Sequence, residues 1–276
     1  MEFLYINLEK NMLIYKIFCA AMVVVTLSLV VEYMSPKWAG VFSGFPTGTA
    51  IILYFYGLEY GIEFAGHSAI YNMVGLVAMQ MFLFGYYLGG VLRARYEILA
   101  SVAGGLFAYL TTIFILSIFS FNIFWAIIIP ISSFFIFHFL FRKIPDIRVD
   151  KRRKTTWNVI ALRATFATLT ISFITEIAKL IGPDWAGLLS AFPSTLFPLM
   201  LIIHWSYGQQ FVHAMIKHVP SGLGGLLAYS VVLYLSYPSA GLYPGMLLAL
   251  ATALLYLIAF PVIIYARDRL IAASDN

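Results

Sequence analysis

The stretch PKWAGVFSGFP, residues 36–46, occurs again almost unchanged as PDWAGLLSAFP, residues 183–193. Seven of the eleven positions are identical when the chain is shifted by 147 residues. Five further identities keep the same register without a gap: Tyr60/Tyr207, Gly61/Gly208, Phe64/Phe211, Gly75/Gly222 and Tyr87/Tyr234. A run of this density, followed by further matches in register, predicts an internal duplication of the chain.

The composition predicts an integral membrane protein. Of 276 residues, 62% are hydrophobic and 11% are charged, whereas soluble domains are about 45–50% apolar and about 25% charged. Apolar runs of about 20 residues recur along the chain, and each is long enough to cross roughly 30 Å of hydrocarbon as a helix. The single Cys19 excludes an internal disulfide framework. We expect an all-α, polytopic membrane helix bundle without a sizeable soluble domain.

Polar stretches divide the apolar sequence into about nine predicted transmembrane helices. They fall at about 12–34, 40–58, 63–91, 98–119, 121–140, 157–181, 186–206, 211–236 and 243–266. The first run lacks a small-residue cleavage site, so we expect it to be a retained helix and not a signal peptide.

The distribution of Lys and Arg predicts the orientation of these helices. The loop RKIPDIRVDKRRK, residues 142–154, has seven basic and two acidic residues and is expected on the cytoplasmic side. Alternation then places two other basic segments inside, 92–97 and 266–269. It places three segments without Lys or Arg outside, 57–63, 181–185 and 236–244. The amino terminus is then outside, and the net charge of +5 reflects topology and not a nucleic-acid partner.

The count of crossings predicts that the two copies are inverted. The first copy uses spans one to four and the second uses spans six to nine, so an odd number of crossings separates equivalent spans. We expect a first four-helix repeat in residues 1–119, a linker helix with the basic cytoplasmic loop in 120–154, and a second four-helix repeat in 155–276. Inverted repeats are typical of secondary transporters.

Two prolines at equivalent positions predict a substrate-binding site. Pro46 and Pro193 lie about a third of the way along the second and seventh spans, and a proline within a helix removes a backbone hydrogen bond. In lipid such breaks survive only against protein or a water-filled cavity. The residues that follow them are Thr47, Gly48 and Thr49 in the first copy, and Ser194 and Thr195 in the second. A helix that begins there presents free amides, which favours an anion or carboxylate. The alternative is a packing kink whose backbone is satisfied by hydroxyls.

Ionisable residues in or beside the apolar spans are further candidates, because each is costly to place in lipid. Glu63 and His67 are one helical turn apart at the outer end of the third span, and Glu176 is near the outer end of the sixth. His204 and His213 flank the inner connection between spans seven and eight. Histidine changes charge near neutral pH, so a proton-coupled mechanism is conceivable. The alternative is that these side chains cap, pair or snorkel at the interface.

The sequence contains no motif for metal, nucleotide or covalent chemistry. His213 and His218 are five residues apart, which does not bring both onto one helix face. The sequence also has no cysteine motif and no closely spaced set of histidines and carboxylates. A Walker-type loop, a dinucleotide fingerprint and a nucleophile elbow are also absent. We expect no metal, no cofactor and no nucleotide-driven pumping by this chain alone.

The segment SFITEIAKLIGPDWAGLLSAFP, residues 172–193, resembles the first two helices of the GlpM-like group of small four-helix inner-membrane proteins. That group has a Glu-Ile-Ala-Lys-type helix end, followed by an Ala/Gly-Leu-Leu segment that ends in Phe-Pro or Leu-Pro. The matching residues are Glu176, Ile177, Ala178, Lys179, Ala186, Gly187, Leu188, Leu189, Phe192 and Pro193. The resemblance covers about 157–266 and reaches the first half only through the repeat, where Leu29 and Glu32 replace Glu176 and Lys179. It implies an inner-membrane, multi-pass protein and carries no activity.

The leading hypothesis is therefore a secondary transporter or permease, not an enzyme, for a small anionic or amphipathic substrate. Its partners would be the lipid bilayer and a small-molecule substrate, with homo-oligomerisation left open and no nucleic acid. One alternative is a lipid flippase or a structural component of an envelope membrane complex. A less favoured alternative is a membrane-embedded hydrolase or transferase using His204, His213 and Glu63, because the predicted topology puts the two histidines and the glutamate on opposite sides.

Overall fold

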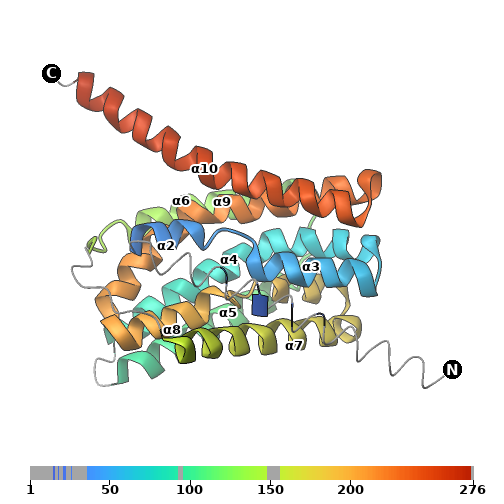
Figure 1. Cartoon of the computed structure of the whole chain (residues 1–276), viewed down its shortest axis with the longest axis horizontal. Helices are drawn as coiled ribbons and strands as arrows, with labels where there is room; N and C mark the ends of the chain where they lie inside the picture. Colours follow the sequence, from blue (N-terminus) through green and yellow to red (C-terminus); the bar gives the residue numbers. More distant parts are fainter. Residues whose placement is uncertain are drawn as a thin grey trace.

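The computed structural model describes residues 36–92, 96–147 and 156–274, together with the single positions 15, 18, 21, 22 and 26. Within these residues every regular element is an α-helix, and the helices pack into one bundle (Figure 1). The helices are α2 (Pro36–Phe42), α3 (Thr47–Glu59), α4 (Ile62–Leu92), α5 (Glu97–Leu116), α6 (Ile123–Phe141), α7 (Trp157–Ser190), α8 (Leu196–Tyr207), α9 (Gln209–Ala240) and α10 (Leu242–Ser274). The expected all-α bundle is confirmed.

Seven stretches of the described residues are long and apolar enough to cross a membrane. They are Lys37–Glu59, Ile62–Leu92, Glu97–Leu116, Ile123–Phe141, Trp157–Ser190, Gln209–Ala240 and Leu242–Phe260. The chain is therefore compatible with a multi-pass membrane protein, but the predicted count of nine is not reached. The predicted span 12–34 lies almost entirely outside the described residues. The predicted span 186–206 is divided between the end of α7 and the short apolar helix α8.

The backbone of α7 turns sharply near its carboxyl end, which explains this division. Gly182 has a φ of 78°, a value that glycine reaches at little cost, and Pro183 follows it. Residues 183–190, which we call the short arm of α7, run from this turn toward the middle of the bundle and end before Pro193. Short arm and α8 together therefore correspond to the predicted seventh span.

The interior of the bundle is formed by α4 and α9 together with the broken helix α2–α3. In the most apolar part of α4 and of α9, 61% of the residues are buried, against 22% in α5, α6 and α10. Large apolar side chains are exposed on these outer helices, among them Phe107, Phe135, Leu247 and Leu255. An apolar outer surface of this kind suits a lipid environment, in which such side chains lose nothing by exposure.

Small residues let several helices approach closely. A Cβ atom added at Gly85 of α4 would lie 2.3 Å from the carbonyl oxygen of Gly104 in α5, and one at Gly89 would lie 2.1 Å from that of Ala100. Glycine is therefore required at these crossings, and close packing of backbones is the usual source of helix association in membranes.

Candidate functional site

The two proline breaks meet in the middle of the bundle. The first break lies between α2 and α3, and the second lies between the short arm of α7 and α8 (Figure 1). Thr47 Oγ1 and Thr195 Oγ1 form a hydrogen bond of 2.9 Å across them. A Cβ atom added at Gly48 would lie only 2.1 Å from Ser194 Oγ. Residues that are almost 150 positions apart in the sequence are therefore in direct contact.

A small cavity of about 20 Å³ lies between the two breaks. Seven of the predicted site residues line it: Pro46, Thr47, Gly48, Thr49, Pro193, Ser194 and Thr195. Met79 of α4 and Leu226 of α9 close it from the sides. Its lining contains hydroxyl, backbone and apolar groups but no Lys, Arg, His, Asp or Glu.

The helix ends that lead into the breaks have their carbonyl groups satisfied. After α2, the amides of Gly44 and Phe45 donate to the carbonyls of Val41 and Phe42 at 3.1 and 3.0 Å. The hydroxyl of Ser43 donates to the carbonyl of Gly40 at 2.5 Å.

The same pattern recurs 147 residues later, at the end of the short arm. The amides of Ala191 and Phe192 donate to the carbonyls of Leu188 and Leu189 at 3.3 and 3.0 Å. Ser190 Oγ donates to the Gly187 carbonyl at 2.7 Å, and Thr49 Oγ1 donates to the carbonyl of Ser190 at 3.0 Å.

The helix ends that leave the breaks have free donors. The first bond back to the break is made by Ala50 to the Pro46 carbonyl in α3, and by Phe197 to the Pro193 carbonyl in α8, both at 2.7 Å. For the amides just before these, no acceptor is found among the described residues: Gly48, Thr49, Thr195 and Leu196. Unsatisfied amides of this kind carry the positive end of the helix dipole.

One hydroxyl in the cavity also has no partner. Ser194 is 1% exposed, and within the described part of the chain nothing forms a hydrogen bond with its Oγ. Buried hydroxyls are normally satisfied because an unmade hydrogen bond costs about 1–3 kcal/mol. Ser194 therefore marks a position where a polar ligand is expected.

The predicted outer candidates lie away from this cavity. His67 Nε2 is 2.8 Å from Asp184 Oδ1, and both side chains are about half exposed. Glu63 is exposed in the first turn of α4. Glu176 lies near Tyr60: burial, followed by the nearby carboxylates of Glu59 and Glu176, raises the pKa of the Tyr60 hydroxyl to about 12. None of these groups contributes to the cavity lining.

The two histidines that flank the connection between α8 and α9, His204 and His213, are buried within the bundle. His204 is 2% exposed, and its Nδ1 is 2.8 Å from the hydroxyl of Tyr86. Its Nε2 is 3.8 Å from a carboxylate oxygen of Glu97. His213 is 7% exposed and packs edge-on against Tyr87, with ring centres 4.6 Å apart. Neither residue lines the cavity, so the twelve predicted site residues fall into three separate groups.

A buried asparagine that sequence reasoning missed secures the second break. Asn72 of α4 donates to Ser190 Oγ at 2.7 Å and accepts from Ser230 Oγ of α9 at 2.8 Å. These bonds join α4, α7 and α9 at one point. The only signal in the sequence was an amide in an otherwise apolar segment, where polar side chains act as interhelical contacts.

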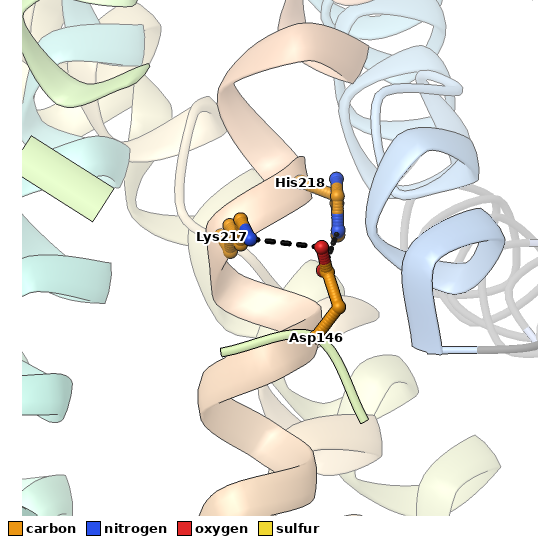
Figure 2. Close-up of polar contacts among 3 residues, drawn as sticks. All are labelled: Asp146, Lys217 and His218. Carbon is orange, nitrogen blue, oxygen red and sulfur yellow. Dashed lines mark hydrogen bonds and ion pairs between the residues drawn. The ribbon is translucent and has the colours of Figure 1, made fainter. Parts of the chain in front are cut away.

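A carboxylate that sequence reasoning missed, Asp146, anchors the segment after α6. Asp146 is hydrogen-bonded to Lys217 Nζ at 2.9 Å and to His218 Nε2 at 2.7 Å, as Figure 2 shows. The bond from Lys217, with a smaller contribution from His218, lowers the pKa of the Asp146 carboxyl below its usual value. The basic loop is thereby attached to α9.

No group of three or more His, Cys, Asp or Glu side chains that could hold a metal ion occurs in the part of the chain described. Comparison of the chain with protein-family models, with curated proteins and with solved structures gives no match. The resemblance of residues 172–193 to the GlpM-like proteins therefore stays a prediction, and the function has to be argued from the geometry above.

Proposed function

We propose that the chain is a secondary transporter or permease whose substrate binds between the two helix breaks, near the middle of the membrane. The observation that carries the proposal is that two broken helices, at equivalent places in a sequence repeat, face each other across one cavity. Paired broken helices at a repeat interface are the usual substrate site of transporters built from inverted repeats.

The helix boundaries support a duplicated structure. α4 begins at Ile62 and α9 begins at Gln209, which is 147 residues later. Gly61 and Gly208, directly before these helices, have φ values of 92° and 86°. The hydrogen bonds around the two breaks also recur at this interval, down to the bonds from Thr47 to Phe45 and from Ser194 to Phe192. These recurring features support the proposal that the second copy is built like the first.

The contacts between the copies are reciprocal, which supports a twofold relation. A Cβ at Gly40 would meet Met215 and His218, and a Cβ at Gly187 would meet Ser68 and Tyr71. Gly187, Ser68 and Tyr71 are the positions equivalent to Gly40, Met215 and His218. When residue i contacts residue j and their equivalents make the same contact, the two surfaces are related by a twofold axis.

The direction of the helices at the cavity supports inversion. Thr47 contacts Thr195, and Gly48 lies against Ser194. Further along α3, Thr49 Oγ1 donates to the Ser190 carbonyl and the Tyr56 hydroxyl donates to the Ala186 carbonyl. The partner number therefore falls from 195 to 186 as the residue number rises from 47 to 56, so α3 and the short arm run antiparallel. Such an arrangement is expected if one copy is turned over in the membrane.

The polar contacts support the orientation derived from charge. His67 pairs with Asp184, and the predicted topology has both outside. Glu97 is close to His204, and Asp146 binds Lys217 and His218, all of which the topology has inside. We extend the proposal to an inner-membrane location, with the loop after α6 in the cytoplasm, on the basis of the GlpM-like resemblance and the positive-inside rule.

In this proposal the two halves rock about the central cavity and open it alternately to each side. A cavity of about 20 Å³ has room for roughly one or two water-sized groups. A lipid flippase would instead need a groove open to acyl chains, and a membrane-embedded enzyme would need Glu63 to approach His204 and His213. Glu63 lies in the first turn of α4, whereas His204 is hydrogen-bonded to Tyr86 near the other end of that helix.

Access to the cavity from the two sides tests the proposal without knowledge of the substrate. Ser194→Cys in a Cys19→Ser background places one thiol in the cavity. We expect a membrane-impermeant maleimide to label it in sealed right-side-out vesicles and also in inside-out vesicles. The matched control is Ala178→Cys, a fully buried position of α7 outside the cavity, which should stay unlabelled.

A locked variant completes this test. Thr47→Cys with Thr195→Cys should form a disulfide, since the Oγ1 atoms of these residues are 2.9 Å apart. The rate at which maleimide labels a third thiol, Ser43→Cys in the cavity lining, should then fall when the pair is oxidised before labelling and recover after reduction. The proposal is wrong if the Ser194→Cys thiol reacts no faster than the Ala178→Cys thiol from both sides.

A further inference from the structure

The cavity between the breaks offers hydrogen-bond donors from two helices. The amides of Gly48 and Thr49 at the start of α3, and of Thr195 and Leu196 at the start of α8, have no acceptor in the described structure. The carbonyl ends of α2 and of the short arm, in contrast, are closed by the bonds of their own residues. Donors therefore prevail in the surroundings of the cavity, and this favours a negative ligand.

Hydroxyl groups give independent evidence for a ligand. Ser194 Oγ is buried, lines the cavity and has no hydrogen-bond partner within the described residues. Thr47 and Thr195 share one hydrogen bond, so only one of their two hydroxyl protons is used by it. Thr49 is different, since it donates to the carbonyl of Ser190. Two hydroxyl protons are thus left for a ligand, in addition to the four amides.

The size and charge of the cavity limit what the ligand can be. About 20 Å³ has room for roughly one or two water-sized groups, which favours a small ion over an organic acid. The lining has no basic side chain to balance a divalent ion, and an uncompensated buried charge is costly. Two helix amino termini of about +0.5 charge each balance roughly one negative charge.

We propose that the cavity binds a small monovalent inorganic anion of halide size, held by the amides at the starts of α3 and α8 and by the hydroxyl of Ser194. This names a substrate class for the site and rests on the proposed transport function. Because two amides come from each copy, the ion lies between the copies and keeps part of its ligands when either half moves.

Thermal unfolding of the purified full chain in detergent tests this binding. The probes are sodium fluoride, sodium chloride and sodium bromide, with sodium gluconate and sodium sulfate at the same ionic strength as controls for salt effects. Choline chloride replaces sodium to separate the anion from the cation. We expect a saturable rise in the unfolding temperature with at least one halide, whichever cation accompanies it.

Variants identify the site. Ser194→Ala removes the unpartnered hydroxyl and should raise the dissociation constant of the halide about 10- to 100-fold, the usual effect of losing a hydrogen bond to a charged group. Ser194→Cys retains a weaker donor, so its dissociation constant for the halide should lie between those of the unaltered chain and Ser194→Ala. Ser236→Ala, in a buried serine that bonds to the backbone away from the cavity, is the matched control and should bind as the unaltered chain does.

The outcomes separate this inference from the transport proposal. Binding that needs sodium, binding that is equal in Ser194→Ala, or no saturable effect of any halide relative to gluconate would each overturn the anion site. If no halide binds but the Ser194→Cys thiol is reached from both sides, transport survives with another substrate. If a halide binds and the thiol is reached from neither side, the ion is structural and the transport proposal falls.

Discussion

Gly44, within the first break, is the position where a single methyl group should be most damaging. A Cβ atom there would lie 1.8 Å from the carbonyl oxygen of Gly222 in α9, and 2.1 Å from its carbon. Ordinary contact begins at 3.4 Å, so the two backbones would have to separate by roughly 1.6 Å in Gly44→Ala. The atom in the way belongs to a helix backbone and cannot turn aside as a side chain would.

The cost follows from the rigidity of this contact. Extra methylene groups forced into a packed interior cost about 1–3 kcal/mol, and a backbone clash belongs at the upper end of that range. A loss of about 3 kcal/mol corresponds to a fall of roughly 6–12 °C in the unfolding temperature of a chain of this size. Separation of α2 from α9 should also weaken halide binding, because the same break carries the amides of Gly48 and Thr49.

A matched variant separates this clash from the general effect of losing a glycine. Gly66, inside α4, has no atom within 4 Å of an added Cβ, so Gly66→Ala should raise stability by about 0.5–1 kcal/mol. Thermal unfolding in detergent compares the two. If Gly44→Ala is as stable as Gly66→Ala, the two copies do not meet at Gly44 and Gly222, and the reasoning about the breaks fails with them.

Three further predictions concern contacts described above. A Cβ at Gly75 would lie 2.7 Å from the Cβ of Ala191, so Gly75→Ala should lower the free energy of unfolding by about 1–2 kcal/mol. Ala191→Gly in the same chain should restore most of that loss. Additive losses in the double-mutant cycle would contradict the contact. Asn72→Ala should lower the free energy of unfolding by about 1–2 kcal/mol in thermal unfolding. The cost is no larger because the hydroxyls of its two partners keep bonds to their own helices. An effect below about 0.3 kcal/mol would mean that the amide does not stabilise the contact between the helices. For Asp146 the pKa in the folded chain is lowered, so its contribution is present above the unfolded pKa of about 3.9 and is lost as pH falls through the folded pKa. Asp146→Asn should therefore reduce the loss of unfolding free energy at acid pH by up to about 1 kcal/mol, a small effect because the carboxylate is 63% exposed. The effect should shrink in high salt. A difference between the two chains that appears only above pH 6 would contradict the prediction.

The paired breaks could be predicted from sequence because the same proline-containing stretch occurs twice, at 36–46 and 183–193. Pro46 and Pro193 each stand in a run that suits a helix, and the same small and hydroxyl residues surround both. A proline cannot donate a backbone hydrogen bond, so the interruption is a local property of the chain. The contact between the two breaks is not local, and it could be expected only by analogy with transporters built from inverted repeats.

The states of the ionisable residues could not be predicted in the same way. His204 is only three residues from the end of α8, which suggests an interfacial side chain, yet it is buried against Tyr86. Sequence gives the depth of a residue along its helix but not which neighbour covers it. For the same reason, Asn72 was missed: its importance depends on Ser190 and Ser230, more than 100 positions away.

The turn at Gly182 lies where the sequence predicts a loop between two helices. In the structure the backbone of α7 leaves the helical conformation at this glycine, and the short arm follows it directly. The glycine and proline were visible in the sequence. How tightly the chain reverses there depends on packing of the short arm against α4, which residues 181–185 do not reveal.

The hydrogen bonds of Asn72 make the two breaks unequal. Val219 occupies the equivalent place in the second copy, so this amide steadies only one of the two breaks. If the net worth of the amide is about 1 kcal/mol, two otherwise equal orientations would be populated in a ratio of about five to one. A transporter built from two similar halves would then favour one of its two orientations at rest. In Asn72→Val the two orientations should become equally populated.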